Sequence, residues 1–205
     1  MLSKSKEIVK LPWTRSSVYR LKTIGDGSCF FHALSLSYYL PYISNISNGT
    51  KFNRRQFVKD LRLDLSNRLA SKVDKFDKNS KTFYEYLSRG KLHEMSLVLD
   101  KYKLYNMQEE LKSNSPVDNT YNEFISEILD KDIYLIDIAK MDVYITGNDM
   151  DLLYKGRDSI VIGIIGNHYE LIGTMNNLGI MSTLFSSENK FISDIKNRMK
   201  IILGV

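Results

Sequence analysis

The spacing of apolar residues divides the chain into a helical first part and a strand-rich last part. The clearest helical pattern places Phe57, Leu61, Leu65 and Leu69 on one face, with charged residues on the other faces. This four-residue spacing predicts an amphipathic helix, and we expect Asn53 to cap its start. Further helices are expected from Ser80 to Gly90, from Leu92 to Leu111, from Asn119 to Leu129 and, with a basic face, from Glu188 to Leu203.

The last part of the chain contains short runs that alternate or are rich in β-branched residues, which is typical of strands. Gly166-Asn167 is a two-residue hairpin signal between two of these runs. Helices followed by such strands predict an α+β fold, with the helices packed on a small, mostly antiparallel sheet. The expected strands are Val18–Ile24, Ile133–Ile138, Asp142–Thr146, Ser159–Ile165 and His168–Thr174, with a turn or loop at 147–151.

The chain has 205 residues, a length that fits one domain. We expect a polar N-terminal arm at residues 1–17, anchored by Trp13, and a single domain at residues 18–205. No apolar run reaches the ~20 residues that span a bilayer, and the first residues have no apolar signal-peptide core. We therefore expect a cytoplasmic protein that does not enter a membrane.

Composition and charge narrow the kinds of site that the chain can hold. The chain has 1 cysteine, so an internal disulfide and Cys-rich metal sites are excluded. The net charge of +5 is mild, and aromatic residues are not interleaved with Lys and Arg in one patch. A nucleic-acid partner is therefore not expected.

The stretch from Thr23 to Leu40 holds the only cysteine, Cys29. The Asp26-Gly27 pair before it predicts a turn, and Ser28 is then suited to cap a helix. An apolar run follows to Leu40, and we expect a buried helix that Pro41 ends. Cys29 would lie in the first turn, where unpaired N–H groups and the helix dipole favour the thiolate over the thiol. This context predicts a nucleophilic cysteine, whereas a cysteine without it is more often a buried core residue.

A cysteine nucleophile needs a base, and the chain has 3 histidines. His168 opens a strand directly after the hairpin turn, and Glu170 shares its face because positions two apart on a strand point the same way. His32 is a competing base on the helix of Cys29, although a structural role bonded to the backbone is the expected one. His93 is expected at the surface.

The sequence Asp26-Gly27-Ser28-Cys29-Phe30-Phe31-His32-Ala33 resembles the cysteine block of the ovarian-tumour (OTU) family of cysteine proteases. The later Gly166-Asn167-His168-Tyr169-Glu170-Leu171 resembles the histidine strand of the same family. The resemblance implies Cys29 as nucleophile and His168 as general base, and it requires no cofactor. Asp26 corresponds to the loop aspartate, and the third catalytic member stays open between Asp26 and Glu170.

The family resemblance implies a deubiquitinase, a thiol protease that hydrolyses the isopeptide bond after the C-terminal glycine of ubiquitin. Its partners would be ubiquitin or polyubiquitin chains, with ubiquitin-like modifiers as further candidates, and a viral member would act in the host cytosol. The alternative is a ubiquitin-binding module on the same fold whose activity is weak or lost. Acidic residues are expected along the path of the basic ubiquitin tail, and the candidates are Asp118, Glu123, Glu127 and Asp149.

Overall fold

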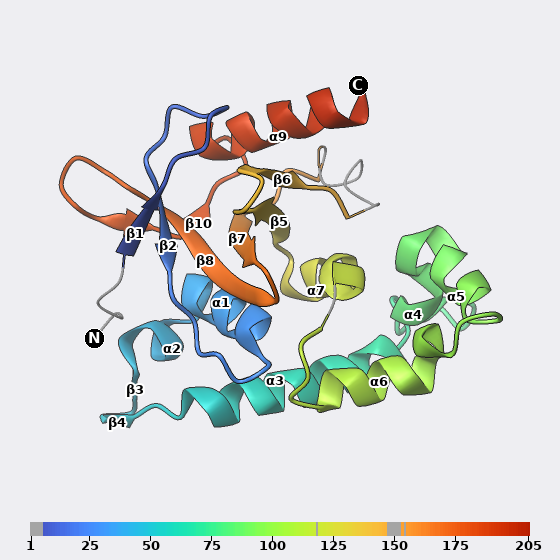
Figure 1. The fold of residues 1–205 in the computed structure, drawn as a ribbon. Helices are drawn as coiled ribbons and strands as arrows, with labels where there is room; N and C mark the ends of the chain where they lie inside the picture. Colours follow the sequence, from blue (N-terminus) through green and yellow to red (C-terminus); the bar gives the residue numbers. More distant parts are fainter. Residues whose placement is uncertain (1–5, 118, 147–152, 154) are drawn as a thin grey trace.

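The computed structural model describes residues 6–117, 119–146, 153 and 155–205 (Figure 1). Its α-helices are α1 (Cys29–Tyr38), α2 (Leu40–Ser44), α3 (Arg54–Leu69), α4 (Phe83–Tyr86), α5 (Lys91–Met95), α6 (Leu104–Lys112), α7 (Asn122–Leu129) and α9 (Lys190–Leu203). Short 3₁₀ helices are η1 (Leu87–Gly90), η2 (Asp100–Tyr102) and η3 (Asn119–Tyr121). The strands are β1 (Lys6–Val9), β2 (Val18–Leu21), β3 (Ile46–Ser47), β4 (Thr50–Lys51), β5 (Asp132–Asp137), β6 (Asp142–Tyr144), β7 (Ser159–Ile165), β8 (His168–Met175), β9 (Met181–Ser182) and β10 (Leu184–Phe185).

The strands form one main sheet with the order β1-β2-β8-β7-β5-β6, to which β10 adds at β7 and β9 at β8. The pairing of β5 with β7 is parallel, and the other pairings are antiparallel. The short β3–β4 hairpin stands apart from this sheet. The expected α+β fold, with helices on a mostly antiparallel sheet, is confirmed.

Both faces of the central strands are buried, and the alternation along β5 shows how. Ile133 and Leu135 pack into the core that α1, α3, α6 and α7 cover, whereas Tyr134 and Ile136 pack against α9 on the other face. Figure 1 shows α9 above the sheet and α1 below it. Since successive side chains of a strand point to opposite faces, a continuously apolar strand is what this sandwich between helices needs.

The N-terminal segment joins the sheet. Lys6–Val9 form the edge strand β1 against β2, and Val9 and Leu11 are buried, so this part of the expected arm packs on the domain. Trp13, the expected anchor, donates its indole N–H to the carbonyl of Met141 at 2.9 Å. The division of the chain into an arm and a single domain stays a prediction.

Two helix boundaries differ from those that the sequence suggests. Helix α1 ends at Tyr38, and Pro41 lies in the first turn of a new helix, α2, where its missing N–H costs nothing. The single helix expected from Leu92 to Leu111 is divided into α5, η2 and α6. At the end of α5 the hydroxyl of Ser96 donates to the carbonyl of His93 at 2.5 Å, a local bond that competes with helix continuation.

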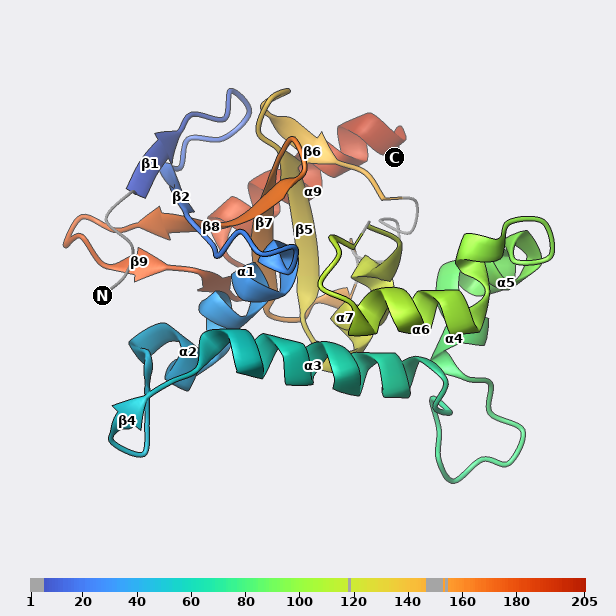
Figure 2. The ribbon, with the colours of Figure 1, turned by 60° about the horizontal axis from the view of Figure 1, so that its bottom comes forward.

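Helix α3 begins at the predicted cap, because the side chain of Asn53 accepts the N–H of Gln56 at 3.1 Å. Helix α6 lies along α3, and α4 and α5 lie beyond the end of α3 (Figure 2). Reciprocal bonds between Ser66 and Gln108 fasten α3 to α6 at 2.9 and 3.0 Å. Within the described residues, no helix is both long and apolar enough to cross a membrane.

Candidate active site

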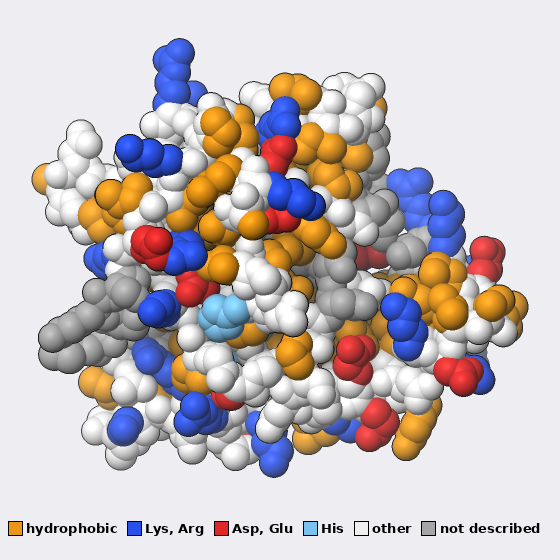
Figure 3. All heavy atoms as spheres, in the orientation of Figure 1, with side chains coloured by type: hydrophobic (Ala, Val, Ile, Leu, Met, Phe, Trp, Pro, Cys, Tyr) orange, Lys and Arg blue, Asp and Glu red, His pale blue; other side chains and the backbone are white. Residues whose placement is uncertain are grey.

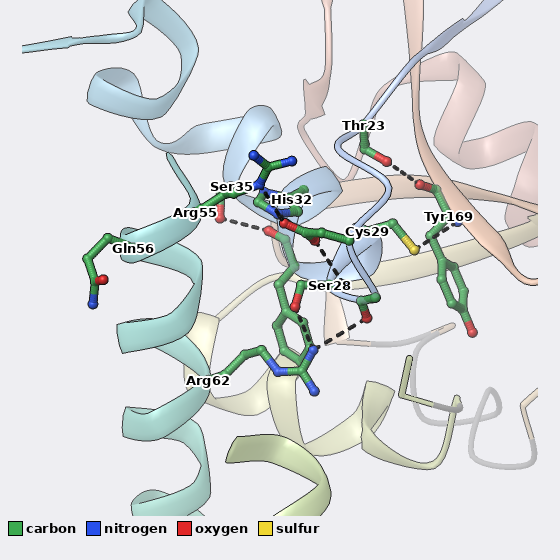
Figure 4. Close-up of polar contacts among 12 residues, drawn as sticks. Thr23, Ser28, Cys29, His32, Ser35, Arg55, Gln56, Arg62 and Tyr169 are labelled. Atoms are coloured by element: carbon green, nitrogen blue, oxygen red, sulfur yellow. Dashed lines mark hydrogen bonds and ion pairs between the residues drawn. The ribbon is translucent and has the colours of Figure 1, made fainter. Parts of the chain in front are cut away.

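Cys29 is the first residue of α1, and strand β8 lies directly beside its side chain. The backbone N–H of Tyr169 donates to the Sγ of Cys29 at 3.4 Å (Figure 4). The ring of Tyr169 also packs edge-on against Phe30, with 5.3 Å between ring centroids. The fold thus brings the early cysteine segment and the late histidine strand into contact, as the two sequence blocks predict. Cys29 is only 3% exposed, so its side chain is buried beside β8.

The turn before Cys29 requires glycine for two reasons. Gly27 has a φ of +84°, a conformation that side chains disfavour. A Cβ added to it would lie 1.7 Å from the carbonyl oxygen of Asn114, which is impossible without backbone movement. The segment at residues 113–116 therefore packs directly on the cysteine turn, a contact that the Asp-Gly turn signal alone does not reveal.

Ser28 precedes α1 but its hydroxyl does not cap the helix, so that expectation is wrong. Its Oγ instead accepts a hydrogen bond from Nη1 of Arg62 at 2.7 Å (Figure 4). Its backbone N–H donates to Oδ1 of Asp26 at 3.1 Å. The turn is thus held by Asp26 on one side and by a buried arginine of α3 on the other.

His168 begins β8 and its side chain is 35% exposed. Its Nε2 lies 3.4 Å from Oγ1 of Thr23 and 3.9 Å from Oε1 of Glu170. The hydroxyl of Thr23 also donates to the carbonyl of Tyr169 at 2.6 Å, which fixes the start of β8 against residues 23–25. The Nε2 atom of His168 therefore faces Thr23 and Glu170.

Glu170 is 4% exposed and lies between two basic side chains. Its Oε2 is 3.4 Å from Nε of Arg20, and its Oε1 is on the side of His168. Neither the Oε2 nor the Arg20 Nε makes a hydrogen bond within the described residues. Arg20 also pairs with Glu7 of the edge strand. The Glu170 carboxylate therefore faces both the His168 ring and the Arg20 guanidinium.

Asp26 contacts His32, and no contact joins it to His168 among the residues that the structure describes. The carboxylate oxygens lie 3.1 and 3.2 Å from Nε2 of His32, and Arg55 donates to Oδ2 at 3.2 Å. Burial opposes ionisation of Asp26, but the attraction of His32 and the hydrogen bonds from Ser28 and Arg55 outweigh it and lower its pKa. The charged carboxylate therefore organises the cysteine turn.

His32 is fully buried, and its Nδ1 lies 2.6 Å from the hydroxyl of Tyr42. Side chains therefore hold this ring, and the expected bonding to the backbone is wrong. Burial lowers the pKa of His32, although the attraction of Asp26 opposes the shift. The effect of burial exceeds the attraction of Asp26, so the ring is neutral at pH 7. His93 is exposed, as expected from the sequence.

Burial raises the pKa of Cys29, against the opposing effect of the N–H groups of Tyr169, Phe30 and Cys29 itself. The expectation that the helix start alone holds a resting thiolate is therefore wrong, because desolvation of the charged sulfur exceeds what the helix start supplies. Burial of the sulfur therefore favours the neutral thiol over the thiolate.

Three residues that support the site carry no motif in the sequence. Thr23 and Arg20 come from the lead-in to the cysteine block, and Arg62 comes from α3. For Arg62 a signal does exist, because Val58, Arg62, Leu65 and Leu69 recur at helical spacing and all are buried. A charged residue on the apolar stripe of a helix marks a cation with partners inside the fold.

Four acidic residues are expected along the path of the ubiquitin tail, and the structure describes two of them, Glu123 and Glu127, in different surroundings. Asp118 and Asp149 lie outside the described residues. Glu127 pairs with Lys155 and Arg157, which neutralise its charge, and Glu123 is half-buried. In the part of the chain that the structure describes, no group of three or more His, Cys, Asp and Glu side chains is close enough to hold a metal ion.

Comparisons with known proteins establish the fold. No family model matches the sequence, and no curated protein matches it either. Among solved structures, an ovarian tumour (OTU) domain in complex with ubiquitin matches with a TM-score of 0.53 and 16% identity, covering 97% of this chain and 91% of that chain. The OTU domain of OTUD1 matches with a TM-score of 0.44 and 15% identity over 76% of this chain and 85% of that chain. The chain has the fold of an OTU domain.

Proposed function

We propose that the protein is a deubiquitinating cysteine protease that hydrolyses the isopeptide bond after the C-terminal glycine of ubiquitin. One observation carries the proposal: the only thiol of the chain, on an OTU fold, accepts a hydrogen bond from the residue that follows His168. The OTU domain of matching fold was solved with ubiquitin bound, which supports the same substrate here.

The first chemical step forms a thioester. Nδ1 of His168 takes the proton of the Cys29 thiol, and the sulfur attacks the carbonyl carbon of the terminal glycine. Glu170 on the Nε2 side stabilises the imidazolium that forms. Because burial raises the pKa of Cys29, we expect the proton to leave the sulfur only when substrate is bound.

The negative charge that develops on the carbonyl oxygen needs N–H donors. The N–H of Cys29 is in the first turn of α1 and has no partner within the helix. The N–H of Ser28 is already bonded to Asp26, so it is not a donor for the oxyanion. Removing one such donor costs about 10²–10³-fold in rate in other enzymes.

The second half of the reaction releases both products. His168 gives its proton to the lysine ε-amine, the C–N bond breaks, and the amine leaves. The ring then takes a proton from water, the hydroxide equivalent attacks the thioester, and the C–S bond breaks. His168 returns this proton to the sulfur, which restores the Cys29 thiol, and ubiquitin leaves with a free C-terminal carboxylate. These steps use groups of the chain itself and require no cofactor.

The folded body of ubiquitin needs a binding surface of its own, and we propose the helical region around α5, beyond the end of α3 (Figure 2). Apolar side chains there are exposed: Met95, Leu97, Val98, Leu99 and Tyr105. Figure 3 shows hydrophobic side chains gathered over α5. Exposed apolar patches of this kind mark interaction sites.

One observation favours a second candidate, a ubiquitin-binding module with weak or no activity. Within the described residues, the sulfur of Cys29 makes no hydrogen bond to the His168 ring, and its burial raises its pKa. A binding module has no need of a thiolate. Both candidates bind ubiquitin, but only the protease forms a covalent bond through the sulfur of Cys29.

The deciding experiment incubates the protein with ubiquitin that carries a C-terminal propargyl amide. We expect a covalent adduct on Cys29, located by mass spectrometry, and none with Cys29→Ala. A panel of differently linked diubiquitins and fluorogenic ubiquitin-like modifiers then gives the specificity. A folded protein that binds ubiquitin but forms no adduct supports the module, and one that neither reacts nor binds overturns both candidates.

A further inference from the structure

Arg62 is a buried arginine whose hydrogen bonds join three separate segments of the chain. The residue is only 1% exposed. Its five N–H groups all find acceptors, at distances of 2.7 to 3.4 Å. The acceptors are the carbonyls of Gly27, Glu110, Leu111 and Ser115 and the hydroxyl of Ser28.

None of these acceptors is a carboxylate. Two of the carbonyls belong to the last turn of α6, where the helix dipole presents partial negative charge. The guanidinium also lies over the ring of Phe31 in α1, 4.7 Å from its centroid. Burying a cation is costly, and burial lowers the pKa of Arg62, while Glu110, Tyr121, Asp26 and Cys29 act in the other direction. Neutral acceptors on three segments point to a role in holding backbone in place.

We propose that Arg62 is a positioning residue that fixes the Gly27–Ser28 peptide, so that the N–H groups at the start of α1 face the substrate carbonyl. In its catalytic consequence this inference rests on the proposed function. Arg62 also links the cysteine turn to the end of α6, the helix that follows the exposed apolar side chains at residues 95–99.

The peptide plane between Gly27 and Ser28 is held from opposite sides. In a trans peptide the C=O and the N–H point in opposite directions. The C=O of Gly27 accepts from Arg62, and the N–H of Ser28 donates to Asp26 at 3.1 Å. A flip of this plane would break both bonds and turn the Gly27 carbonyl toward the Asp26 carboxylate, which would repel it.

A lysine cannot replace this arginine. Its ammonium is a single point with three donors, whereas the guanidinium reaches acceptors on three segments at once. The Arg62→Lys variant therefore keeps the charge and removes the bridge. Arg54 provides a matched control on the same helix: it donates to the carbonyls of Tyr42 and Ile43 and lies over the ring of Tyr42, with no bond to residues 26–29.

The first measurement compares turnover with simple alkylation of the only thiol. For Arg62→Lys we expect kcat on a fluorogenic ubiquitin substrate to fall roughly 10²-fold, with KM changed less than about threefold, the loss typical of a misplaced catalytic group. The rate of Cys29 alkylation by iodoacetamide should change less than about threefold, because alkylation develops no oxyanion. Arg54→Lys should leave both rates within about twofold of wild type.

The second measurement needs no substrate and therefore separates this inference from the proposed function. Amide hydrogen exchange, read by NMR, should be faster at Ser28 in Arg62→Lys than in wild type, and unchanged there in Arg54→Lys. If Arg62→Lys does not fold, Ser28→Ala removes only the hydroxyl acceptor, and its kcat should fall with KM unchanged. If neither ubiquitin nor its derivatives react with wild type, the exchange rate at Ser28 alone decides the positioning role.

Three results would overturn the inference. One is unchanged exchange at Ser28 in a folded Arg62→Lys protein. Another is an equal loss of kcat in the Arg62 and Arg54 variants. The third is an alkylation rate that rises while kcat falls, because that pattern reports local unfolding around a buried thiol and a merely structural role.

Discussion

The backbone N–H of Tyr169 donates to the Sγ of Cys29 across 3.4 Å, so the first residue of α1 and the second residue of β8 are in direct contact. Both partners belong to regular elements that pack on the main core. Their relative position is therefore set by buried apolar contacts, and not by a loop that must close. A site built on such elements holds its geometry more closely than one built on loops.

Replacing His168 by alanine should lower kcat on a ubiquitin substrate by about 10²–10⁴-fold, the usual contribution of a general base. Binding of ubiquitin should persist, since the side chain is 35% exposed and supports no core packing. The measurements are steady-state kinetics and ubiquitin titration. His93→Ala is the matched control for kcat, because that exposed ring belongs to α5, which lies apart from α1 and β8 (Figure 1). Retained turnover in His168→Ala would transfer the role of base to His32.

Replacing Glu170 by glutamine should cost less turnover than replacing His168, because an orienting group matters less than the base that it orients. The amide keeps the shape but removes the charge that faces His168 and Arg20. We expect a loss of kcat, because the ring of His168 is then less firmly oriented. Glu7→Gln, which changes only the outer partner of Arg20, should leave kcat unchanged. A loss equal to that of His168→Ala would show that Glu170 is indispensable.

Local sequence signals predicted helices and strands best where each signal indicates only one kind of structure. The strand at Ser159–Ile165 and the start of β8 at His168 agree with the structure residue for residue, because a β-branched run and Gly166-Asn167 both specify a hairpin. Pro41 misled because proline both ends helices and fits their first turn. The short strands β9 and β10 carry no periodic pattern, since each has only two residues.

The sequence indicated which two segments meet at the site but not what surrounds them. Cys29 and His168 came from their own segments, and the fold brings those segments together. The partners of Asp26 and Ser28 come from elsewhere, from His32 and Arg62. The state of the thiol depends on how deeply the sulfur is buried, a tertiary property that helix position alone does not give. Contacts between residues far apart in the sequence therefore could not be predicted from local patterns.

The raised pKa of Cys29 predicts how the free protein reacts with iodoacetamide. A thiol with a pKa above its usual value of about 8.5 is alkylated slowly at neutral pH, and its rate should still be rising at pH 9. Stopped alkylation reactions at a series of pH values, quantified by mass spectrometry, give the profile directly because the chain has 1 cysteine. A small thiol such as N-acetylcysteine serves as reference. A plateau already reached at pH 6 would mean a resting thiolate and contradict this reading of the site.

Replacing Leu65 by alanine should destabilise the protein by about 2–5 kcal/mol, because the side chain is fully buried between α3 and the core. Leu63→Ala on the same helix is the matched control. Its side chain is 48% exposed, so the change should stay within about 0.5 kcal/mol. Urea unfolding followed by circular dichroism measures both. Similar losses in the two variants would mean that α3 packs through another face.

Buried His32 predicts that stability falls as the pH drops below about 6.5. Burial lowers the pKa of this ring in the folded state, so between that value and the unfolded pKa of about 6.5 the unfolded chain binds more protons. The free energy of unfolding then decreases with falling pH, by at most about 1.4 kcal/mol per pH unit for one group. Asp26 adds a second decrease at lower pH, since its lowered pKa gives stability that is lost as pH falls from about 3.9 through the folded value.

The experiment compares urea unfolding at pH 7.5 and pH 5.5. Wild type should lose more stability between these values than His32→Gln, whose amide does not titrate but can still bond to Asp26 and Tyr42. His93→Gln makes the same substitution at an exposed position and serves as the control. A pH dependence that is unchanged in His32→Gln would mean that His32 is already charged in the fold, with the attraction of Asp26 outweighing burial.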